Sequence, residues 1–156
     1  MGKNVFPGRY TAEQDGQLVV FLIGMRVNKL WAIHKWFPVF MAMPAMIREL
    51  YGNRELGFRS VETFFKPRTI LMVQYWCSEE ELLSYSKQTK HVAAWRKFNQ
   101  KVGNNDAVGI YHETYILTSK NYEAIYANMP VFGLAKATEH KRITPSRNSA
   151  RKRLDL

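Results

Sequence analysis

The chain contains a single cysteine, Cys77, and relatively few acidic residues, 13 Asp and Glu among 156 residues. One cysteine cannot form an intramolecular disulfide, and it cannot build a zinc site from cysteines. The acidic residues do not form a clustered set of carboxylates that would bind a metal ion. We therefore expect a cytoplasmic protein from a reducing compartment, with no metal site.

Long hydrophobic runs and glycine-rich motifs are also missing. The longest apolar stretch, Phe37 to Ile47, is too short to span a bilayer and contains two prolines. The first ten residues lack the apolar core of a signal peptide. No phosphate-binding loop, dinucleotide fingerprint or GxSxG turn is present. These absences argue against a membrane span, a nicotinamide enzyme and hydrolysis by a serine nucleophile.

Positive charge is abundant but uneven. The net charge is +10, and residues 136–156 supply half of it, with seven Lys/Arg against two Asp/Glu. We expect a basic, flexible tail over these residues, with His140 in solvent. Such a tail is usually solvated, so nucleic-acid binding is not expected from charge alone.

The remaining chain predicts one folded domain over residues 17–135, after a polar arm at residues 1–16, because 46% of all residues are hydrophobic and 13% are aromatic. Ser78 and Glu81 form a capping box at the start of the second helix. The order strand, helix, strand, strand, helix, strand predicts a ferredoxin-like βαββαβ fold of the α+β class with an antiparallel sheet. The strands are expected at Gln17–Val27, Gly57–Phe65, Thr69–Trp76 and Val108–Leu117, and the helices at Lys29–Tyr51 and Ser78–Val102.

A ferredoxin-like sheet carries helices on one face only. The chain has no spare helix for the other face, so a second copy is the simplest cover. We therefore expect a homodimer, a dimeric α+β barrel, with a cavity between each sheet and its helices.

Two histidines are the leading candidates for chemistry. His112 and Glu113 are neighbours on one strand and point to opposite faces, so they cannot act on one atom together. His112 is either a base in the cavity or a hydrogen-bonded interface residue. His91 borders an apolar arc that includes Trp95 and Phe98. It is either a haem ligand or a structural histidine.

Other residues are candidates for holding a substrate. Gln74 and Tyr115 carry polar groups that can orient a substrate oxygen. The helix at Lys29–Tyr51 is rich in thioether and indole side chains that suit a greasy substrate, or equally a plain core. The predicted substrate-binding residues are Trp31, Trp36, Met41, Met43, Met46 and Trp95.

Five segments together resemble the fumagillin-pathway monooxygenase-like family, which belongs to the dimeric α+β barrel superfamily and is related to the antibiotic-biosynthesis monooxygenases. They are KWFPVFMAMPAMIREL (35–50), QYW (74–76), HVAAWRKFN (91–99), VGIYHETY (108–115) and YEAIYANMPVFGL (122–134). The resemblance implies oxygen insertion into, or oxidative cleavage of, a small hydrophobic molecule. Related barrels do this without a cofactor on substrates that form stabilised carbanions, whereas other branches of the superfamily hold haem.

The resulting hypothesis is a monooxygenase-like oxidoreductase with a pocket between sheet and helices. His112 or His91 acts as general base, and Gln74 and Tyr115 hold the developing oxyanion. One alternative is a haem enzyme of the same fold, a dehydratase or a peroxidase-like enzyme, with His91 or His112 as the iron ligand. The other is a non-catalytic module that binds a hydrophobic ligand.

Overall fold

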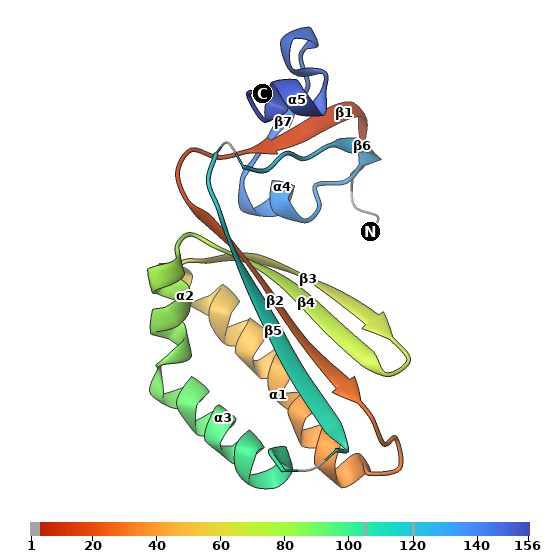
Figure 1. The fold of residues 1–156 in the computed structure, drawn as a ribbon, viewed down its shortest axis with the longest axis vertical. Helices are drawn as coiled ribbons and strands as arrows, with labels where there is room; N and C mark the ends of the chain where they lie inside the picture. Colours follow the sequence, from red (N-terminus) through yellow and green to blue (C-terminus); the bar gives the residue numbers. More distant parts are fainter. Residues whose placement is uncertain (1–3, 105, 120) are drawn as a thin grey trace.

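The computed structural model describes residues 4–104, 106–119 and 121–156. Within them the chain forms two antiparallel sheets, one in the order β3-β4-β2-β5 and a smaller one in the order β6-β1-β7 (Figure 1). The strands are β1 (Phe6–Glu13), β2 (Leu18–Val27), β3 (Phe58–Lys66), β4 (Thr69–Trp76), β5 (Val108–Leu117), β6 (Tyr126–Met129) and β7 (Glu139–Arg142). The helices are α1 (Ile33–Gly52), η1 (Arg54–Leu56), α2 (Glu79–Ser86), α3 (Thr89–Val102), α4 (Leu134–Ala137), η2 (Pro145–Arg147) and α5 (Ala150–Arg153).

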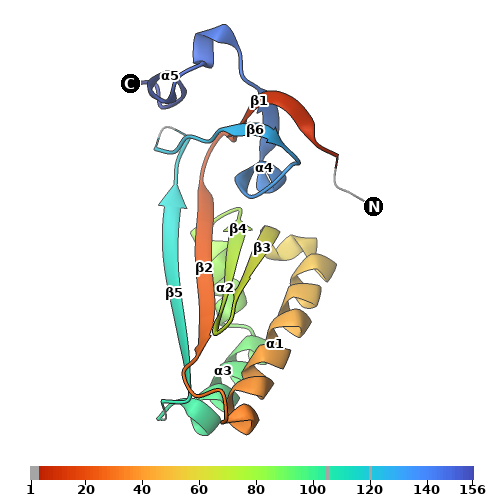
Figure 2. The same cartoon turned by 90° about the vertical axis from the view of Figure 1, so that its right-hand side faces the viewer.

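The larger sheet with its helices confirms the predicted α+β ferredoxin-like fold. Strand β2 is central and pairs antiparallel with β4 and β5, as its near-continuous apolar sequence predicts. Helices α1, α2 and α3 cover one face of this sheet, as the two views in Figures 1 and 2 show. The register aligns Thr63, Met72, Ile23 and His112 in one row across the helix-facing side.

The hydrophobic core lies between that face and the helices. Its largest fully buried side chains include Trp76, Met25, Met72 and Val19 from the sheet and Leu50 from α1. The alternation of strand residues explains this division, because every second side chain of β2 and β4 points toward the helices. A smaller cluster on the outer face joins Leu18 and Tyr75 to Ala137.

The predicted helix at Ser78–Val102 is wrong in one respect, because it is two helices separated at Lys87 and Gln88. Gln88 has an extended backbone (φ −63°, ψ 147°), and the Ser86 hydroxyl donates to the Leu83 carbonyl. Serine hydroxyls compete in this way with helical hydrogen bonding. The predicted cap at the first helix is confirmed: Ser78 Oγ accepts from the Glu81 backbone N–H at 3.3 Å.

Both ends of the chain differ from the expectation. The arm at residues 1–16 contains strand β1, which pairs with β6 and β7. The basic tail contains β7 and α5, and Arg153 is buried against Glu123 with an N–O distance of 2.7 Å. The tail is ordered because its cations find carboxylate partners, which composition alone does not reveal.

His140 is likewise not solvated as expected. It lies on β7, and its ring stacks on Tyr10 with centroids 4.4 Å apart. Phe6 and Tyr126 meet the same imidazole edge-on. The terminal strands therefore share a small aromatic cluster of their own.

No helix in the described ranges has the length and apolar character needed to cross a membrane.

Candidate active site

An apolar cavity of about 340 Å³ lies between α1 and the β3–β4 half of the sheet. This volume is at the lower end of the range for small-molecule pockets, about 300–1,000 Å³. Among the described residues of its wall, Arg48 is the only charged one, and the Thr63 hydroxyl is the only other side-chain hydrogen-bonding group. The lining residues are Phe40, Met43, Pro44, Ile47, Arg48, Thr63, Phe65, Ile70 and Met72.

Helical and strand periodicities place these side chains. Phe40, Pro44 and Arg48 recur every four residues, so they form one stripe along α1. Pro44 has no N–H for the Phe40 carbonyl, and its ring disturbs close helical packing. On the sheet side, Met72 is buried and points to the same face as Thr63, its cross-strand partner. The cavity thus lies between a proline-containing stretch of α1 and the β3–β4 strand pair.

Among the predicted substrate-binding methionines, only Met43 lines this cavity. Met41 is half exposed, and Met46 is partly buried without contributing to the cavity wall.

The predicted tryptophans lie elsewhere. Trp31 is 76% exposed beside α1, whereas the Trp36 indole donates to the Leu30 carbonyl at 3.0 Å. Trp95 on α3 stacks on Phe98 and stays half exposed. The structure therefore does not bring these three tryptophans together around one cavity.

His112 and Gln74 both lie on the helix-facing side of the sheet, in different rows. His112 is exposed on β5, with its ring 5.6 Å from that of Phe21. Gln74 is buried, and its side-chain oxygen accepts from the Trp76 indole at 3.0 Å. Neither side chain lines the cavity, because His112 is two strands away from Met72 and Gln74 is one row beyond it.

Tyr115 and Glu113 lie on the outer face of β5, opposite His112, as strand alternation predicts. The Tyr115 hydroxyl donates to the Glu113 carboxylate at 2.7 Å. This hydrogen bond to an anion raises the pKa of the Tyr115 phenol. The pair is separated from the cavity by the sheet itself.

His91 lies at the junction of α2 and α3. Its Nδ1 is 3.0 Å from the Ser86 carbonyl oxygen, and its ring meets the ring of Tyr85 edge-on. A carbonyl only accepts, so Nδ1 carries the proton. This bond satisfies one of the last carbonyls of α2, which is a structural role.

The part of the chain that builds the cavity matches a known family. A family model described as "Monooxygenase af470-like" matches residues 18–134. The chain belongs to the Monooxygenase af470-like family. The resemblance inferred from the sequence motifs is thereby confirmed.

A named relative matches most of the chain but only part of its own length. Monooxygenase af470 from Aspergillus fumigatus is 28% identical over 137 residues, which is 81% of this chain and 48% of that protein. The chain therefore spans about half the length of the curated relative it matches.

The chain is also similar to solved structures at low sequence identity. An aldoxime dehydratase (OxdRE), solved with butyraldoxime, has a TM-score of 0.59 and 16% identity, covering 94% of this chain and 42% of that chain. SnoaB, described as a cofactor-independent oxygenase from Streptomyces nogalater, has a TM-score of 0.44 and 13% identity, covering 64% and 92% of the two chains.

The donor groups at the cavity of this family member do not fit a haem. Haem iron is held by histidine, cysteine or tyrosine, or by methionine together with histidine. Of these residue types the wall contains only Met43 and Met72. Within the described ranges no three His, Cys, Asp or Glu side chains are grouped to hold a metal ion either. We therefore derive no chemical step through haem.

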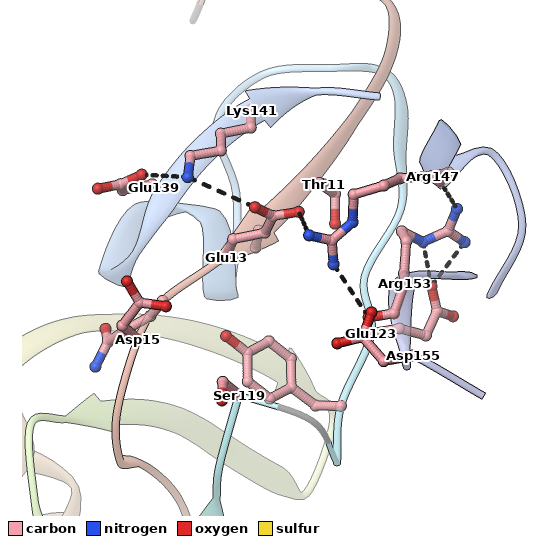
Figure 3. Close-up of a pocket in the computed structure, with 13 residues that line it drawn as sticks. Thr11, Glu13, Asp15, Ser119, Glu123, Glu139, Lys141, Arg147, Arg153 and Asp155 are labelled. Carbon is pink, nitrogen blue, oxygen red and sulfur yellow. Dashed lines mark hydrogen bonds and ion pairs between the residues drawn. The ribbon is translucent and has the colours of Figure 1, made fainter. Parts of the chain in front are cut away.

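A second cavity, of about 310 Å³, lies in the terminal part of the molecule and is polar (Figure 3). Lys141 pairs with Glu139 at 2.7 Å and with Glu13 at 3.5 Å. Arg147 also pairs with Glu13, at 3.1 Å. These ion pairs link β1 to the C-terminal segment, so we assign this cavity a structural role.

Sequence reasoning missed most of the apolar cavity wall, Arg48 in particular. The spacing of Phe40, Pro44 and Arg48 along one helical stripe was the available signal. It was not decisive, because which stripe of α1 borders a cavity depends on how the helix lies over β3 and β4.

Proposed function

We propose that the chain is a monooxygenase-type oxidoreductase that binds a small hydrophobic molecule in the cavity beneath α1. The observation that supports this is the apolar cavity with one cation, Arg48, in its wall. All the residues of that wall lie inside the segment matched by the family model. An apolar cavity with one arginine in its wall suits a hydrophobic molecule that carries negative charge during its reaction.

The proposed reaction needs a substrate whose C–H bond ionises readily. A base removes the proton, and the carbanion transfers electrons to dioxygen and forms a C–O bond, which gives a hydroperoxide after protonation. Loss of water from a hydroperoxide at a CH₂ carbon leaves a ketone, so that R₂CH₂ and O₂ become R₂C=O and H₂O. Dioxygen is the only oxidant required, and Arg48 stabilises the enolate oxygen.

His112 is our candidate for the base. It shares the row Thr63–Met72–Ile23–His112 with the cavity wall and is exposed. It lies two strands from Met72, or about 10 Å at roughly 4.8 Å per strand. A substrate that extends from the cavity across Ile23 brings its reacting carbon toward this imidazole. His91 is less suited, because the carbonyl of Ser86 already engages its Nδ1.

Oxygen uptake by the purified chain tests the proposal. The substrates are cyclic 1,3-diketones, which lose a C–H proton from the carbon between their carbonyl groups, and isotopically labelled dioxygen reports whether oxygen enters the product. We expect Thr63→Phe, which narrows the cavity, to abolish uptake. The matched control is Thr118→Phe, the same change at an exposed position beyond the end of β5. Equal loss in both variants would contradict the cavity as the site.

Steady-state kinetics can distinguish the proposed role of His112 as the base from that of Arg48 as the stabilising cation. His112→Ala is expected to lower kcat by about 10²-fold or more if it is the general base. Arg48→Met is expected to lower kcat/KM because it removes charge stabilisation at the substrate oxygen. An unchanged kcat in His112→Ala would exclude this histidine and indicate that the substrate arrives already ionised.

A second candidate is a module that binds a hydrophobic ligand without reaction. The observation that favours it is that the described cavity wall holds no carboxylate or imidazole to act as a base. Tight binding of the same molecules without oxygen uptake would decide for this alternative.

We also propose that the functional unit is a homodimer joined through the outer face of the larger sheet. Phe64, Tyr111 and Tyr115 on that face are each more than 40% exposed. Residues 132–137 cover part of this face: Leu18 and Tyr75 pack against Ala137, and the Phe132 ring meets the Phe64 ring with centroids 6.3 Å apart. A second copy would cover the remaining apolar surface.

A further inference from the structure

The end of the molecule that lies opposite the two termini (Figure 1) carries several large apolar side chains that are exposed. It is formed by the β2–α1 loop, the first turns of α1 and the β3–β4 turn. Five large apolar residues are exposed there by 47% to 76% of their area: Leu30, Trp31, Ile33, Phe37 and Phe65. We call this set the apolar tip. Exposed apolar groups gathered in one place indicate an interaction surface.

The apolar tip is held in place by specific bonds. The Trp36 indole donates to the Leu30 carbonyl at 3.0 Å, which fixes the backbone just before Trp31. The Arg68 guanidinium donates to the Asn28 carbonyl at 3.2 Å and ties the β3–β4 turn to the β2–α1 loop. The exposure of Leu30 and Trp31 is therefore a property of an anchored loop.

Positive charge surrounds the apolar tip. The strand ends, loops and helix start at this end carry Arg26, Lys29, Lys35, Lys66 and Arg68. The sequence contains no Asp or Glu at residues 16–48 or at residues 63–78. Lys29 pairs with Asp106 at 2.6 Å, and this contact lowers the pKa of that carboxyl. The balance at this end remains strongly positive.

We propose that this end binds the surface of an anionic lipid membrane, with the apolar tip inserted among the headgroups. Tryptophan and other large apolar side chains insert at the boundary between headgroups and acyl chains, while flanking Lys and Arg attract anionic lipids. Both components are present here on one rigid end. Phe65 of the apolar tip also lines the apolar cavity, so the proposed membrane surface adjoins the proposed substrate site.

The charge pattern favours a membrane over a second copy or another protein. Protein interfaces are depleted in lysine, whereas three of the five cations around the apolar tip are lysines. A second copy would bring two strongly positive ends together, which is unfavourable. The proposal does not depend on the oxygenase activity, because lipid binding is measured without any substrate.

Vesicle flotation with the full chain tests this proposal. Phosphatidylcholine vesicles with and without phosphatidylserine are compared at low and high salt. We expect binding only to the vesicles with phosphatidylserine, and weaker binding at high salt because exposed charges are screened. Absence of binding at low salt would overturn the proposal.

Two variants with matched controls locate the binding surface. Trp31→Ala is expected to weaken binding about tenfold, whereas Trp95→Ala, which removes an exposed tryptophan from α3, leaves it unchanged. The double variant Lys66→Glu and Arg68→Glu is expected to weaken it by roughly fivefold or more for each cation. The control is Arg151→Glu with Lys152→Glu, which makes the same change in charge at the opposite end and should leave binding unchanged.

Circular dichroism on each variant checks that the fold is kept. Tryptophan fluorescence tests the same surface without any change of charge. The emission should shift to the blue when anionic vesicles are added, and Trp31→Phe should remove that shift. Equal losses in the control variants would overturn the proposal. So would Trp31-dependent self-association without lipid, because the partner would then be a second copy.

Discussion

His140 lies in an environment that suits an aromatic ring better than an imidazole. Tyr10, Phe6 and Tyr126 surround the ring, and its Nε2 is buried without a hydrogen-bond partner in the described part of the chain. An unpaired buried nitrogen costs about 1–3 kcal/mol. The sequence did not indicate this position, because the three neighbours come from β1 and β6, more than ten residues away in the chain.

Replacing His140 by phenylalanine should therefore stabilise the protein. We expect His140→Phe to raise the free energy of unfolding by about 1 kcal/mol, because it removes the unpaired nitrogen and keeps a ring of similar shape. The exposed His34→Phe serves as the control and should stay within about 0.5 kcal/mol of the parent. Urea unfolding at neutral pH measures both, and a destabilised His140→Phe would contradict the account.

Two buried tyrosines predict how stability depends on pH. Burial, with Tyr126 and Glu62 nearby, raises the pKa of Tyr75 to about 12. Burial, with Glu49 nearby, raises the pKa of Tyr85 to about 12. In an unfolded chain a tyrosine ionises near pH 10. Between about pH 10 and pH 12, each of these tyrosines has therefore lost its hydroxyl proton in the unfolded chain but keeps it in the folded chain.

The contribution of these two tyrosines to the free energy of unfolding should therefore be fully present below about pH 10. It should fall as the pH rises toward 12. Each tyrosine contributes on the order of 2 kcal/mol to that loss. Tyr75→Phe and Tyr85→Phe should each flatten the decline in urea midpoint with pH, whereas Tyr111→Phe, an exposed tyrosine, should not. An equal decline in all three variants would show that other groups cause it.

At the scale of elements, the start of α2 offers a direct test of the capping box. Ser78 accepts from the Glu81 N–H and donates to the Glu81 carboxylate at 3.1 Å. Ser78→Ala should cost about 1 kcal/mol, because the N–H loses its partner. Ser84→Ala, in the exposed middle of the same helix, should be neutral or slightly stabilising. Chemical denaturation compares the two variants. An unchanged free energy of unfolding in Ser78→Ala would contradict a stabilising cap.

Local patterns predicted most elements of the larger sheet, for identifiable reasons. Strand β4 occupies the predicted residues Thr69–Trp76, because an apolar run between two turn signals leaves little choice of boundary. The break at Lys87 and Gln88 was missed because residues 86–91 contain no proline or glycine to indicate the end of a helix. Its cause, the Ser86 hydroxyl and the His91 imidazole, is visible only when contacts are known.

At the scale of the whole molecule, tertiary contacts decided what the sequence could not. The row that joins Thr63 to His112 follows from strand register, which the strand order does not specify. Arg48 entered the site only because α1 lies over β3 and β4. The ordered tail depends on ion pairs such as Arg153 with Glu123, which are 30 residues apart. Each of these features depends on residues that are distant in sequence.

The outer face of the larger sheet carries the last prediction, which concerns assembly. Leu71 lies on this face of β4, in register with Phe64 of β3 and with Gly24 of β2, over which the Tyr111 ring lies. A lysine at position 71 would place a charge in the centre of the proposed dimer interface, where an unpaired charge is costly.

Leu71→Lys should therefore convert the proposed dimer into monomers at micromolar concentration, as light scattering coupled to size exclusion would measure. Val92→Lys adds the same charge on the exposed side of α3 and should leave the mass unchanged. Position 71 is only partly buried within one chain, so the variant should fold and its circular dichroism should match that of the parent. A parent chain that is already monomeric would contradict the dimer and leave Tyr111 and Phe64 exposed in the functional molecule.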